Sequence, residues 1–502
     1  MDDKTIYSKE KDYRSTRSDY SCSSLQAVLQ GISPDGGLFI SPDILSKKFD
    51  WKALIGKPTL EMASMILSWL LPDFKDMDSL VKKAYEGKFE TPDLTPLVEV
   101  GDKYILELFR GPTSAFKDVA LSMLPYLITS AKAQCGATNE TVILTATSGD
   151  TGKAAMEGFH DVPGTRIIVF YPYEGVSPIQ KAQMETQEGK NVKVCAVRGN
   201  FDDCQNAVKQ AFAAVNSMES FKKSNMTLSS ANSINIGRLA PQVTYYFKAY
   251  SDLVGQNRIG VGDDVDFVVP SGNFGDILAG YFAKLMGLPV RHLVCASNEN
   301  KVLTDFLTTG TYDKRRQFLR TSSPSMDILV SSNLERLLFL ASECDATMVS
   351  KLMKDLNSNG FFIVDDTVME KIKTTFKAYC CSEQETISTI GDMYREHGYL
   401  CDPHTAVGIK VADDYRKDYN DSTPLIVLST ASPYKFPSPV SKAIGLPLDG
   451  DEFDQISAIN KATGVPVPKN IGSLKDKVVV HKDVIDKDEI LAYILGVLGI
   501  EV

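Results

Sequence analysis

VDFVVPSGNFGDILAGYFAKLMG, residues 265–287, decides the fold, because it joins an apolar strand to a helix through a short loop. The almost continuous apolar run VDFVVP is typical of a parallel strand that is covered on both faces. SGNFGD is a turn signal, and ILAGYFAKLMG has apolar residues at helical spacing. VRHLVCAS (290–297) follows as the next predicted strand. This order of elements predicts two parallel strands connected by a helix.

The same succession recurs along the chain. TVILTA (141–146) leads into the loop SGDTG and the helical KAAMEGF, and RIIVFYP (166–172) follows as a strand. VKVCAV (192–197) precedes the helical DDCQNAVKQAFAAV, and PLIVLS (424–429) is the last clear strand. We therefore expect an α/β fold with parallel-rich sheets and helices on both faces.

The length predicts more than one domain, because 502 residues exceed what one compact core normally holds. The first hundred residues have helical apolar spacing and no catalytic pattern, whereas the last segment is irregular and ends in a short apolar helix. The expected organisation is a helical N-terminal region (1–100), an α/β region with a candidate catalytic lysine (101–260), a larger α/β region (261–445) and a C-terminal tail (446–502).

The composition is that of an ordinary globular protein, with 43% hydrophobic and 24% charged residues. The net charge is -10, from 54 basic and 64 acidic residues, and no extended Lys/Arg-rich run is present. A nucleic-acid partner is therefore not expected, since such proteins need basic patches. No apolar run approaches the ~18 residues that a membrane span requires, so a membrane partner is not expected either.

The cysteines and histidines bear on the redox compartment and on metal binding. The nine cysteines are scattered, form no C-x-x-C pair and follow an N-terminus that lacks an apolar signal region, which favours reduced thiols in the cytoplasm. The five histidines form no ligand-spaced cluster, so no metal site is expected.

A lysine stands at the start of a predicted helix in ELFRGPTSAFKDVALSML (107–124). Lys117 follows the turn signal Gly111-Pro112, and the positive end of a helix dipole lowers the pKa of an amine placed there. A lysine in that position suits Schiff-base chemistry. The alternative is a solvated lysine beside Asp118, which this segment alone would favour.

Two loops of small residues follow predicted strands and precede predicted helices. TATSGDTG (145–152) offers backbone amides and hydroxyls to an anion, although a plain helix-capping turn is an equal alternative. In SGNFGD, Gly272 and Gly275 would let backbone N–H groups approach a phosphate closely. Neither loop matches a dinucleotide fingerprint, and the nearby Gly260-Val261-Gly262 precedes its strand, which disfavours a nicotinamide-dependent dehydrogenase.

Two further segments carry polar side chains where ligands bind in α/β proteins. In ANSINIGRLAPQ (231–242), Asn232, Ser233 and Arg238 could converge on an oxyanion, unless they only cap a helix. VLSTASPYKF (427–436) places Thr430 at a strand's carboxyl end. The nearby segment Asp402-Pro403-His404-Thr405 is more typical of a structural role. Together, the lysine, the two phosphate cradles and the hydroxyl-bearing strand end indicate a site for pyridoxal 5′-phosphate (PLP).

The set resembles the threonine synthase family of the fungal and bacterial type. GPTSAFKD, TSGDTG, NSIN-x-x-R, PSGNFGD and STA-x-P-x-KF occur here in that family's order. The resemblance extends from YRSTR (13–17) and DGGLFI (35–40) through SPSMDILVSSN (323–333) to DPHTAVG (402–408). It implies the tryptophan-synthase-β-like PLP fold, fold type II, with two α/β domains around a cofactor cleft and a helical N-terminal region.

The resemblance also implies residue roles. Lys117 would bind the cofactor and move protons, Asp150 would approach the cofactor's ring hydroxyl, and Thr430 would face its pyridine nitrogen. The residues implied for the cofactor phosphate are Gly272, Asn273, Phe274 and Gly275, and those implied for the substrate's carboxylate and phosphate are Ser148, Thr151, Asn232, Ser233 and Arg238.

The implied reaction converts O-phospho-L-homoserine and water into L-threonine and phosphate, in a monomer or homodimer. The family commonly has His and Ala at the positions of Ser432 and Tyr434, and this departure leaves substrate choice and product open. The alternative is a phospho-lyase that releases 2-oxobutyrate and ammonia from O-phosphohomoserine or O-phosphothreonine. A non-catalytic paralogue would be free to lose Lys117, and the chain keeps it.

Overall fold

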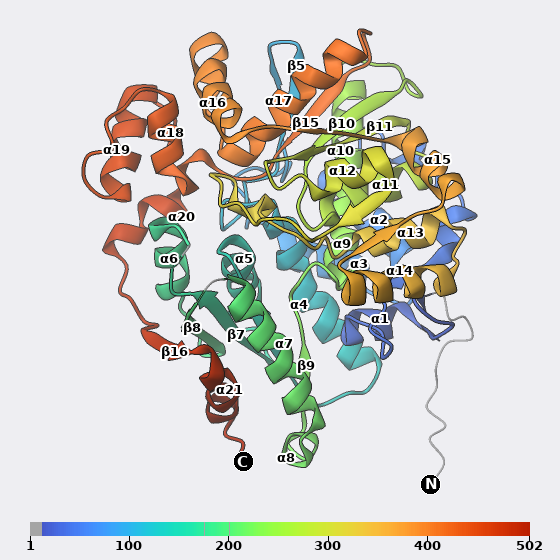
Figure 1. Cartoon of the computed structure of the whole chain (residues 1–502), viewed down its shortest axis with the longest axis vertical. Helices are drawn as coiled ribbons and strands as arrows, with labels where there is room; N and C mark the ends of the chain where they lie inside the picture. The colour runs from blue at the N-terminus through green and yellow to red at the C-terminus, as the bar shows by residue number, and fades with distance from the viewer. Residues whose placement is uncertain (1–12, 175, 200, 502) are drawn as a thin grey trace.

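The stretch that decides the fold has the expected structure in the computed structural model, which describes residues 13–174, 176–199 and 201–501 (Figure 1). Strand β10 (Val265–Pro270) is buried along its whole length, and helix α11 (Gly275–Leu285) follows it after four residues. β10 pairs in parallel with β11 (Val290–Ser297) on one side and with β15 (Leu425–Ser429) on the other. The sequence prediction of parallel strands with connecting helices is confirmed.

β10 lies inside a six-stranded sheet of order β14-β11-β10-β15-β5-β4, in the upper half of the molecule in Figure 1. The outer strands are β14 (Phe376–Cys380), β5 (Lys103–Glu107) and β4 (Leu97–Val100), and only the β4–β5 pair is antiparallel. Helix α17 (Pro403–Asp418) packs on one face, against β10 and β15, whereas α11 and α10 (Val243–Gly255) pack on the other.

The lower half holds a five-stranded sheet, wholly parallel, of order β16-β8-β7-β6-β9. Its strands are β6 (Glu140–Ala146), β7 (Thr165–Pro172), β8 (Val192–Arg198), β9 (Met226–Ser229) and β16 (Asp483–Asp486). Alternate residues of β6 belong to different cores: Ile143 faces the main core, and Val142 and Leu144 face a second one. Burial of both faces explains why Val142, Ile143 and Leu144 of β6 are all apolar.

Helices cover both faces of this sheet. α4 (Lys117–Gln134) and α5 (Asp150–Phe159) contribute to the main core, and α7 (Phe201–Ser217) and α21 (Ile490–Leu498) to the second. The remaining helices of this half are α6 (Pro178–Glu185), α8 (Glu219–Lys222) and α9 (Ile236–Leu239).

The N-terminal region contains the expected helices α1 (Ser24–Gln30), α2 (Thr59–Leu70) and α3 (Met77–Tyr85). It also contains a small antiparallel sheet that the sequence reasoning missed, formed by β1 (Tyr13–Ser15), β2 (Ser21–Cys22) and β3 (Phe39–Ile40). These strands have two or three residues each, too few to show an alternating pattern.

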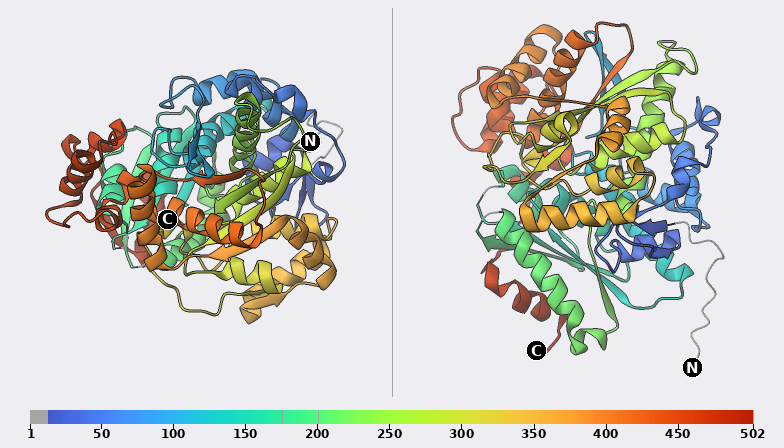
Figure 2. Two further views of the ribbon diagram at one scale, coloured as in Figure 1. Left: turned by 90° about the horizontal axis from the view of Figure 1, so that it is seen from above. Right: turned by 45° about the vertical axis from the view of Figure 1, so that its right-hand side comes forward.

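The other elements surround the six-stranded sheet. They are α12 (Val302–Thr309), β12 (Thr311–Asp313), α13 (Leu334–Ala341), α14 (Ala346–Asn359), β13 (Phe361–Ile363), α15 (Asp366–Thr375), α16 (Glu383–His397), α18 (Pro437–Ala443), α19 (Glu452–Thr463) and α20 (Lys469–Gly472). The N-terminal helices and the α18–α20 segment lie on opposite sides of the molecule (Figure 2).

The domain boundaries expected at residues 100, 260 and 445 stay predictions. The strands of each sheet come from both sides of these positions: β4 joins the six-stranded sheet, and β16 joins the five-stranded one. In the described part of the chain, no helix has both the length and the apolar character needed to cross a membrane.

Candidate active site

A cavity of about 770 Å³ lies where loops from the carboxyl ends of both sheets meet. Its wall includes the loop after β6, the loop after β10 and the start of α4. Ligands of open α/β sheets bind at such carboxyl edges. Every residue that the sequence analysis assigned to a cofactor or substrate lines this cavity: Lys117, Ser148, Asp150, Thr151, Asn232, Ser233, Arg238, Gly272, Asn273, Phe274, Gly275 and Thr430.

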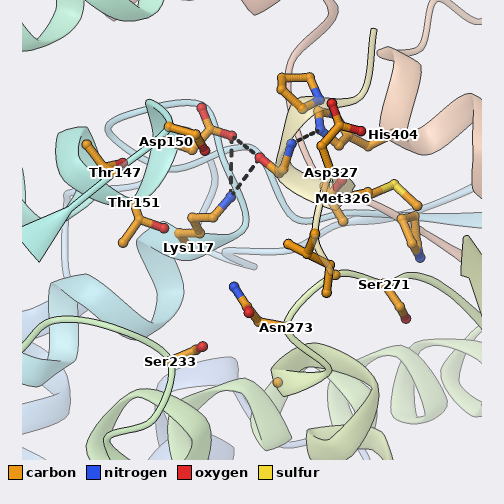
Figure 3. Close-up of a pocket in the computed structure, with 18 of the residues that line it drawn as sticks. Lys117, Thr147, Asp150, Thr151, Ser233, Ser271, Asn273, Met326, Asp327 and His404 are labelled. Atoms are coloured by element: carbon orange, nitrogen blue, oxygen red, sulfur yellow. Dashed lines mark hydrogen bonds and ion pairs between the residues drawn. The ribbon is translucent and has the colours of Figure 1, made fainter. Parts of the chain in front are cut away.

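Lys117 is the first residue of α4, and its side chain points into the cavity (Figure 3). Its Nζ atom lies 3.4 Å from Asp150 Oδ2 and 3.4 Å from Ser325 Oγ, and the residue is only 8% exposed. Burial lowers the pKa of Lys117, and the Lys435 and Arg238 charges lower it further, against the opposing effect of Asp150. Lys117 is therefore more available as a free amine than an exposed lysine.

Asp150 begins α5 and is buried among nitrogen donors. Lys435 Nζ lies 2.6 Å from its Oδ1 atom, and Gln180 Nε2 donates to the same oxygen at 2.9 Å. Burial alone would raise the pKa of Asp150, but Lys435 and Lys117 hold it well below the usual range. Asp150 is therefore a carboxylate at neutral pH. Sequence reasoning missed Lys435 and Gln180 as its partners.

The turn before Lys117 is joined to the end of β15. Ala115 and Ala431 form an isolated antiparallel bridge, and the Phe116 N–H donates to the Thr430 carbonyl at 2.8 Å. The Thr430 N–H in turn donates to Thr405 Oγ1 at 3.3 Å. These backbone contacts place the lysine and Thr430 on the same wall of the cavity, although they are far apart in the sequence.

The loop between β10 and α11 is shaped for close approach of a ligand to its backbone. Phe274 has a left-handed φ of 63°, and a Cβ atom on Gly272 would lie 2.6 Å from the Ser325 carbonyl oxygen. Ser331 Oγ donates to the Gly272 carbonyl at 2.9 Å, and the Asn333 N–H donates to the Asn273 carbonyl at 3.0 Å. These contacts fix the two loop carbonyls. The first N–H groups of α11 are therefore available to bind an anion in the cavity.

Arg238 is a buried cation without a carboxylate partner among the described residues. It is 4% exposed, its Nη1 donates to the Ala231 carbonyl at 2.7 Å, and its Nε has no hydrogen-bond partner in the described structure. Burial lowers the pKa of Arg238 to about 10, so the guanidinium is still charged at neutral pH. A buried, uncompensated guanidinium on a cavity wall is suited to bind an anion.

The other predicted substrate residues line the same cavity as Lys117 and Arg238. Ser148 and Thr151 belong to the loop after β6, whose shape is held by Thr147 Oγ1 accepting from the Gly149 and Gly152 N–H groups at 3.0 and 2.9 Å. Ser233 Oγ lies 3.4 Å from Ser332 Oγ, and Ser233 stands below Lys117 in the view of Figure 3. The wall therefore offers several hydroxyl groups to a polar substrate.

Ser325 and His404 also line the cavity, and sequence reasoning missed the role of both. The Ser325 N–H donates to His404 Nε2 at 3.1 Å, so His404 Nδ1 carries the ring hydrogen and donates to Asp402 Oδ2 at 2.6 Å. This chain of contacts holds Ser325 beside Lys117. The segment at 402–405 therefore supports the site as well as capping α17.

Comparison with known proteins agrees with this geometry. The family model described as "Pyridoxal-phosphate dependent enzyme" matches residues 92–430, and "Threonine synthase, C-terminal" matches 405–486. The threonine synthase of Saccharomyces cerevisiae is 41% identical over 470 residues, which cover 86% of this chain and 89% of that protein. The chain belongs to the threonine synthase family.

Solved structures of the family have the same fold. The yeast threonine synthase structure has a TM-score of 0.87 at 35% identity, and a PLP-bound threonine synthase from Brucella melitensis has 0.84 at 36%. Both comparisons cover 97% of this chain and 98% of the other. Human "Threonine synthase-like 1" is 40% identical over 435 residues, and the match covers 84% of this chain but only 58% of that longer relative.

The cofactor of this threonine synthase family member is PLP, and the residues of the cavity fit it. The ligand is an anion with an aldehyde, which needs a buried amine and a phosphate cradle. Lys117 would supply the amine, and the glycine loop, where a Cβ on Gly272 would have no room, would supply the cradle. Two buried polar atoms without partners in the described structure, Arg238 Nε and Asp276 Oδ2, belong to residues of the same wall.

The two departures from the common threonine synthase pattern lie outside the cavity wall. Neither Ser432 nor Tyr434 is among the described residues that line it. Tyr434 packs with Ile179 and Ile456 in a satellite core, and its hydroxyl donates to the Val465 carbonyl at 2.5 Å. The bulk of Tyr434 is therefore accommodated behind the site, which weakens the expectation that this departure alters substrate choice.

The cradle allows a steric prediction. Gly272→Ala places a methyl group against the Ser325 carbonyl, so the loop must shift, and we expect the Kd for PLP to rise about tenfold. The control is Gly496→Ala, because a Cβ at Gly496 of α21 meets no atom within 4 Å. Spectroscopic titration of the two apoproteins measures the effect. Equal Kd values would show that the loop does not hold the cofactor.

Proposed function

We propose that the protein is a threonine synthase that converts O-phospho-L-homoserine and water into L-threonine and phosphate. The observation that carries the proposal is Arg238, a buried guanidinium without a carboxylate partner in the described structure, in the same cavity as Lys117. A phosphorylated amino acid brings two anionic groups to a cofactor that has its own phosphate. The cavity offers Arg238 to an anionic group of the substrate, in addition to the glycine loop for the cofactor phosphate.

The residues proposed to hold PLP are those of the cavity wall. Lys117 would bind its aldehyde carbon, the loop Gly272–Gly275 its phosphate, Thr430 its ring nitrogen and Asp150 its ring hydroxyl. When bound, PLP supplies an electron sink that makes protons on the substrate's α and β carbons acidic. The uncharged Thr430 hydroxyl cannot hold a proton on the ring nitrogen as a carboxylate would. We therefore expect the cofactor ring to withdraw electrons less strongly than a ring with a protonated nitrogen.

Lys117 is proposed to carry the protons. Its buried amine has a lowered pKa, so it can accept a proton from the substrate's α carbon and later return one. Ser325 Oγ and Asp150 Oδ2 both lie 3.4 Å from its Nζ and orient it toward the cavity. The first role of these neighbours is to keep the amine in one position throughout the reaction.

Arg238, Asn232 and Ser233 are proposed to bind the substrate phosphate and to retain it after it leaves. A phosphate held at the wall can orient the attacking water and accept its proton. Retention of phosphate favours threonine over early loss of the unsaturated product. The cavity wall thereby sets the outcome of the reaction as well as the affinity for the substrate.

The test is incubation of the purified protein with O-phospho-L-homoserine, with threonine, 2-oxobutyrate and phosphate measured together. Threonine equal to phosphate establishes a synthase. Phosphate matched by 2-oxobutyrate establishes the phospho-lyase reaction, and a cofactor-loaded protein without turnover refutes this substrate.

We also propose that the protein works in the cytoplasm as a monomer or homodimer. The nine cysteines are scattered along the sequence and form no C-x-x-C pair, as expected for a protein of a reducing compartment. Cell fractionation and light scattering of the purified protein test the two parts. Enrichment in an organelle would refute the location, and a larger assembly would refute the oligomeric state.

A further inference from the structure

Lys435 is the most deeply buried cation at the active site. It belongs to the short 3₁₀ turn Pro433–Lys435 after β15, and its exposure is 0%. Its Nζ contacts Asp150 Oδ1 at 2.6 Å and the Thr113 carbonyl at 3.1 Å. It does not line the cavity in the described structure, so neither substrate nor cofactor is expected to touch it.

The two lysines next to Asp150 make unequal contacts with it. Lys435 is 2.6 Å from one carboxylate oxygen, whereas Lys117 is 3.4 Å from the other and shares it with Ser325. The distances identify Lys435 as the principal counter-ion. A buried carboxylate needs one compensating charge, so with Lys435 present a second one is not required.

We propose that Lys435 is a positioning residue that serves as the permanent counter-ion of Asp150 and thereby leaves the Lys117 nitrogen free to release its proton. Without Lys435, Asp150 would be compensated only by Lys117. The Lys117 amine would then stay protonated in an ion pair with Asp150. An ammonium ion can neither bind a carbonyl carbon nor accept a proton. The proposal rests on the proposed function only for the attachment of PLP to Lys117, and not on the substrate.

The other charged groups around Lys117 do not replace this compensation. Arg238 of α9 is positive and lowers the pKa of Lys117, in the same direction as Lys435. Asp276 of α11 also faces the site, but burial raises its pKa to about 6, and its Oδ1 accepts from the hydroxyls of Tyr245 and Tyr246. Asp118, next in sequence, is likewise raised by burial to a pKa of about 6 and accepts from Thr113. The charges of Lys435 and Asp150 therefore set the proton affinity of the Lys117 nitrogen.

The test is a pH titration of the visible absorption band of the PLP-loaded protein, whose midpoint reports the proton on the Lys117 nitrogen. Lys435→Met removes a positive charge and leaves the Lys117 nitrogen as the only cation paired with Asp150, so the midpoint should rise by about one pH unit or more. Asp150→Asn leaves Lys435 uncompensated, so the midpoint should fall by a similar amount. The double variant should return close to the unmodified protein, because both charges are gone.

Lys475→Met is the matched control, because Lys475 and Asp454 form an exposed ion pair in the same C-terminal segment. It should not move the midpoint. If Lys435→Met does not fold, Asp150→Asn and the double variant still decide: an unchanged midpoint in Asp150→Asn, or no return in the double variant, overturns the proposal. A protein without a Lys117-dependent band would overturn the attachment itself, and this inference with it.

Discussion

Lys117→Ala is expected to lower kcat for threonine formation by about 10³-fold or more, because the side chain proposed to anchor the cofactor is also the one proposed to move the protons. The second lysine beside Asp150 cannot take over. Lys435 is fully buried and paired with Asp150, and its Nζ is directed to the Thr113 carbonyl rather than to the cavity. The measurement is threonine and phosphate release from O-phospho-L-homoserine under saturating cofactor.

Two control variants give the result its meaning. Lys117→Arg retains a positive charge at the start of α4 but provides no free amine, so it should be as inactive as Lys117→Ala. Lys371→Ala removes an exposed lysine that pairs with Glu343 at 2.6 Å and should retain full activity. Activity of Lys117→Ala within about tenfold of the unmodified protein would contradict the assignment of the lysine.

Arg238→Met is expected to lower kcat/KM for the phosphorylated substrate by about 30-fold or more. Loss of one partner from a buried, charge-assisted contact costs about 2–5 kcal/mol, and every 1.4 kcal/mol is a factor of ten. Met fills a similar volume, so packing around Ala231 should be kept while the cation is lost. Stopped assays across substrate concentrations measure the loss.

The product ratio separates this role from a general defect. If Arg238 retains the departing phosphate, Arg238→Met and Asn232→Ala should both divert product toward 2-oxobutyrate. The matched control is Arg258→Met, since Arg258 is an exposed arginine paired with Glu99. Unchanged product ratios in both site variants would refute the role of retained phosphate, even if their rates fall.

The sequence predicted the fold well where the physical signal is local. In 265–287 and 141–159, an apolar run followed by small residues and a helical pattern corresponds to a strand, a loop and a helix of the structure. The sequence pattern does not predict short strands that pair with a strand far away in the sequence. β16 contains Asp483 and Asp486 and shows no burial pattern, and its partner β8 lies almost 300 residues earlier.

The candidate site was predictable for residues that carry their own chemistry in a recognisable loop. Lys117, Arg238 and the glycine loop are examples, and all of them line the cavity. Lys435 and His404 were missed because their roles depend on a partner from another segment. No local pattern shows that Lys435 meets Asp150 or that His404 Nε2 accepts from Ser325.

The bridge between Ala115 and Ala431 ties Lys117 mechanically to the six-stranded sheet, and Lys435 follows the same strand end. Asp150 stands on the five-stranded sheet, at the start of α5. A rigid-body displacement of one sheet relative to the other would therefore change the distance between Asp150 and Lys435. By linkage, a change in that distance would also change the proton affinity of the Lys117 amine. In this architecture, the relative position of the two sheets and the proton affinity of the Lys117 amine would change together.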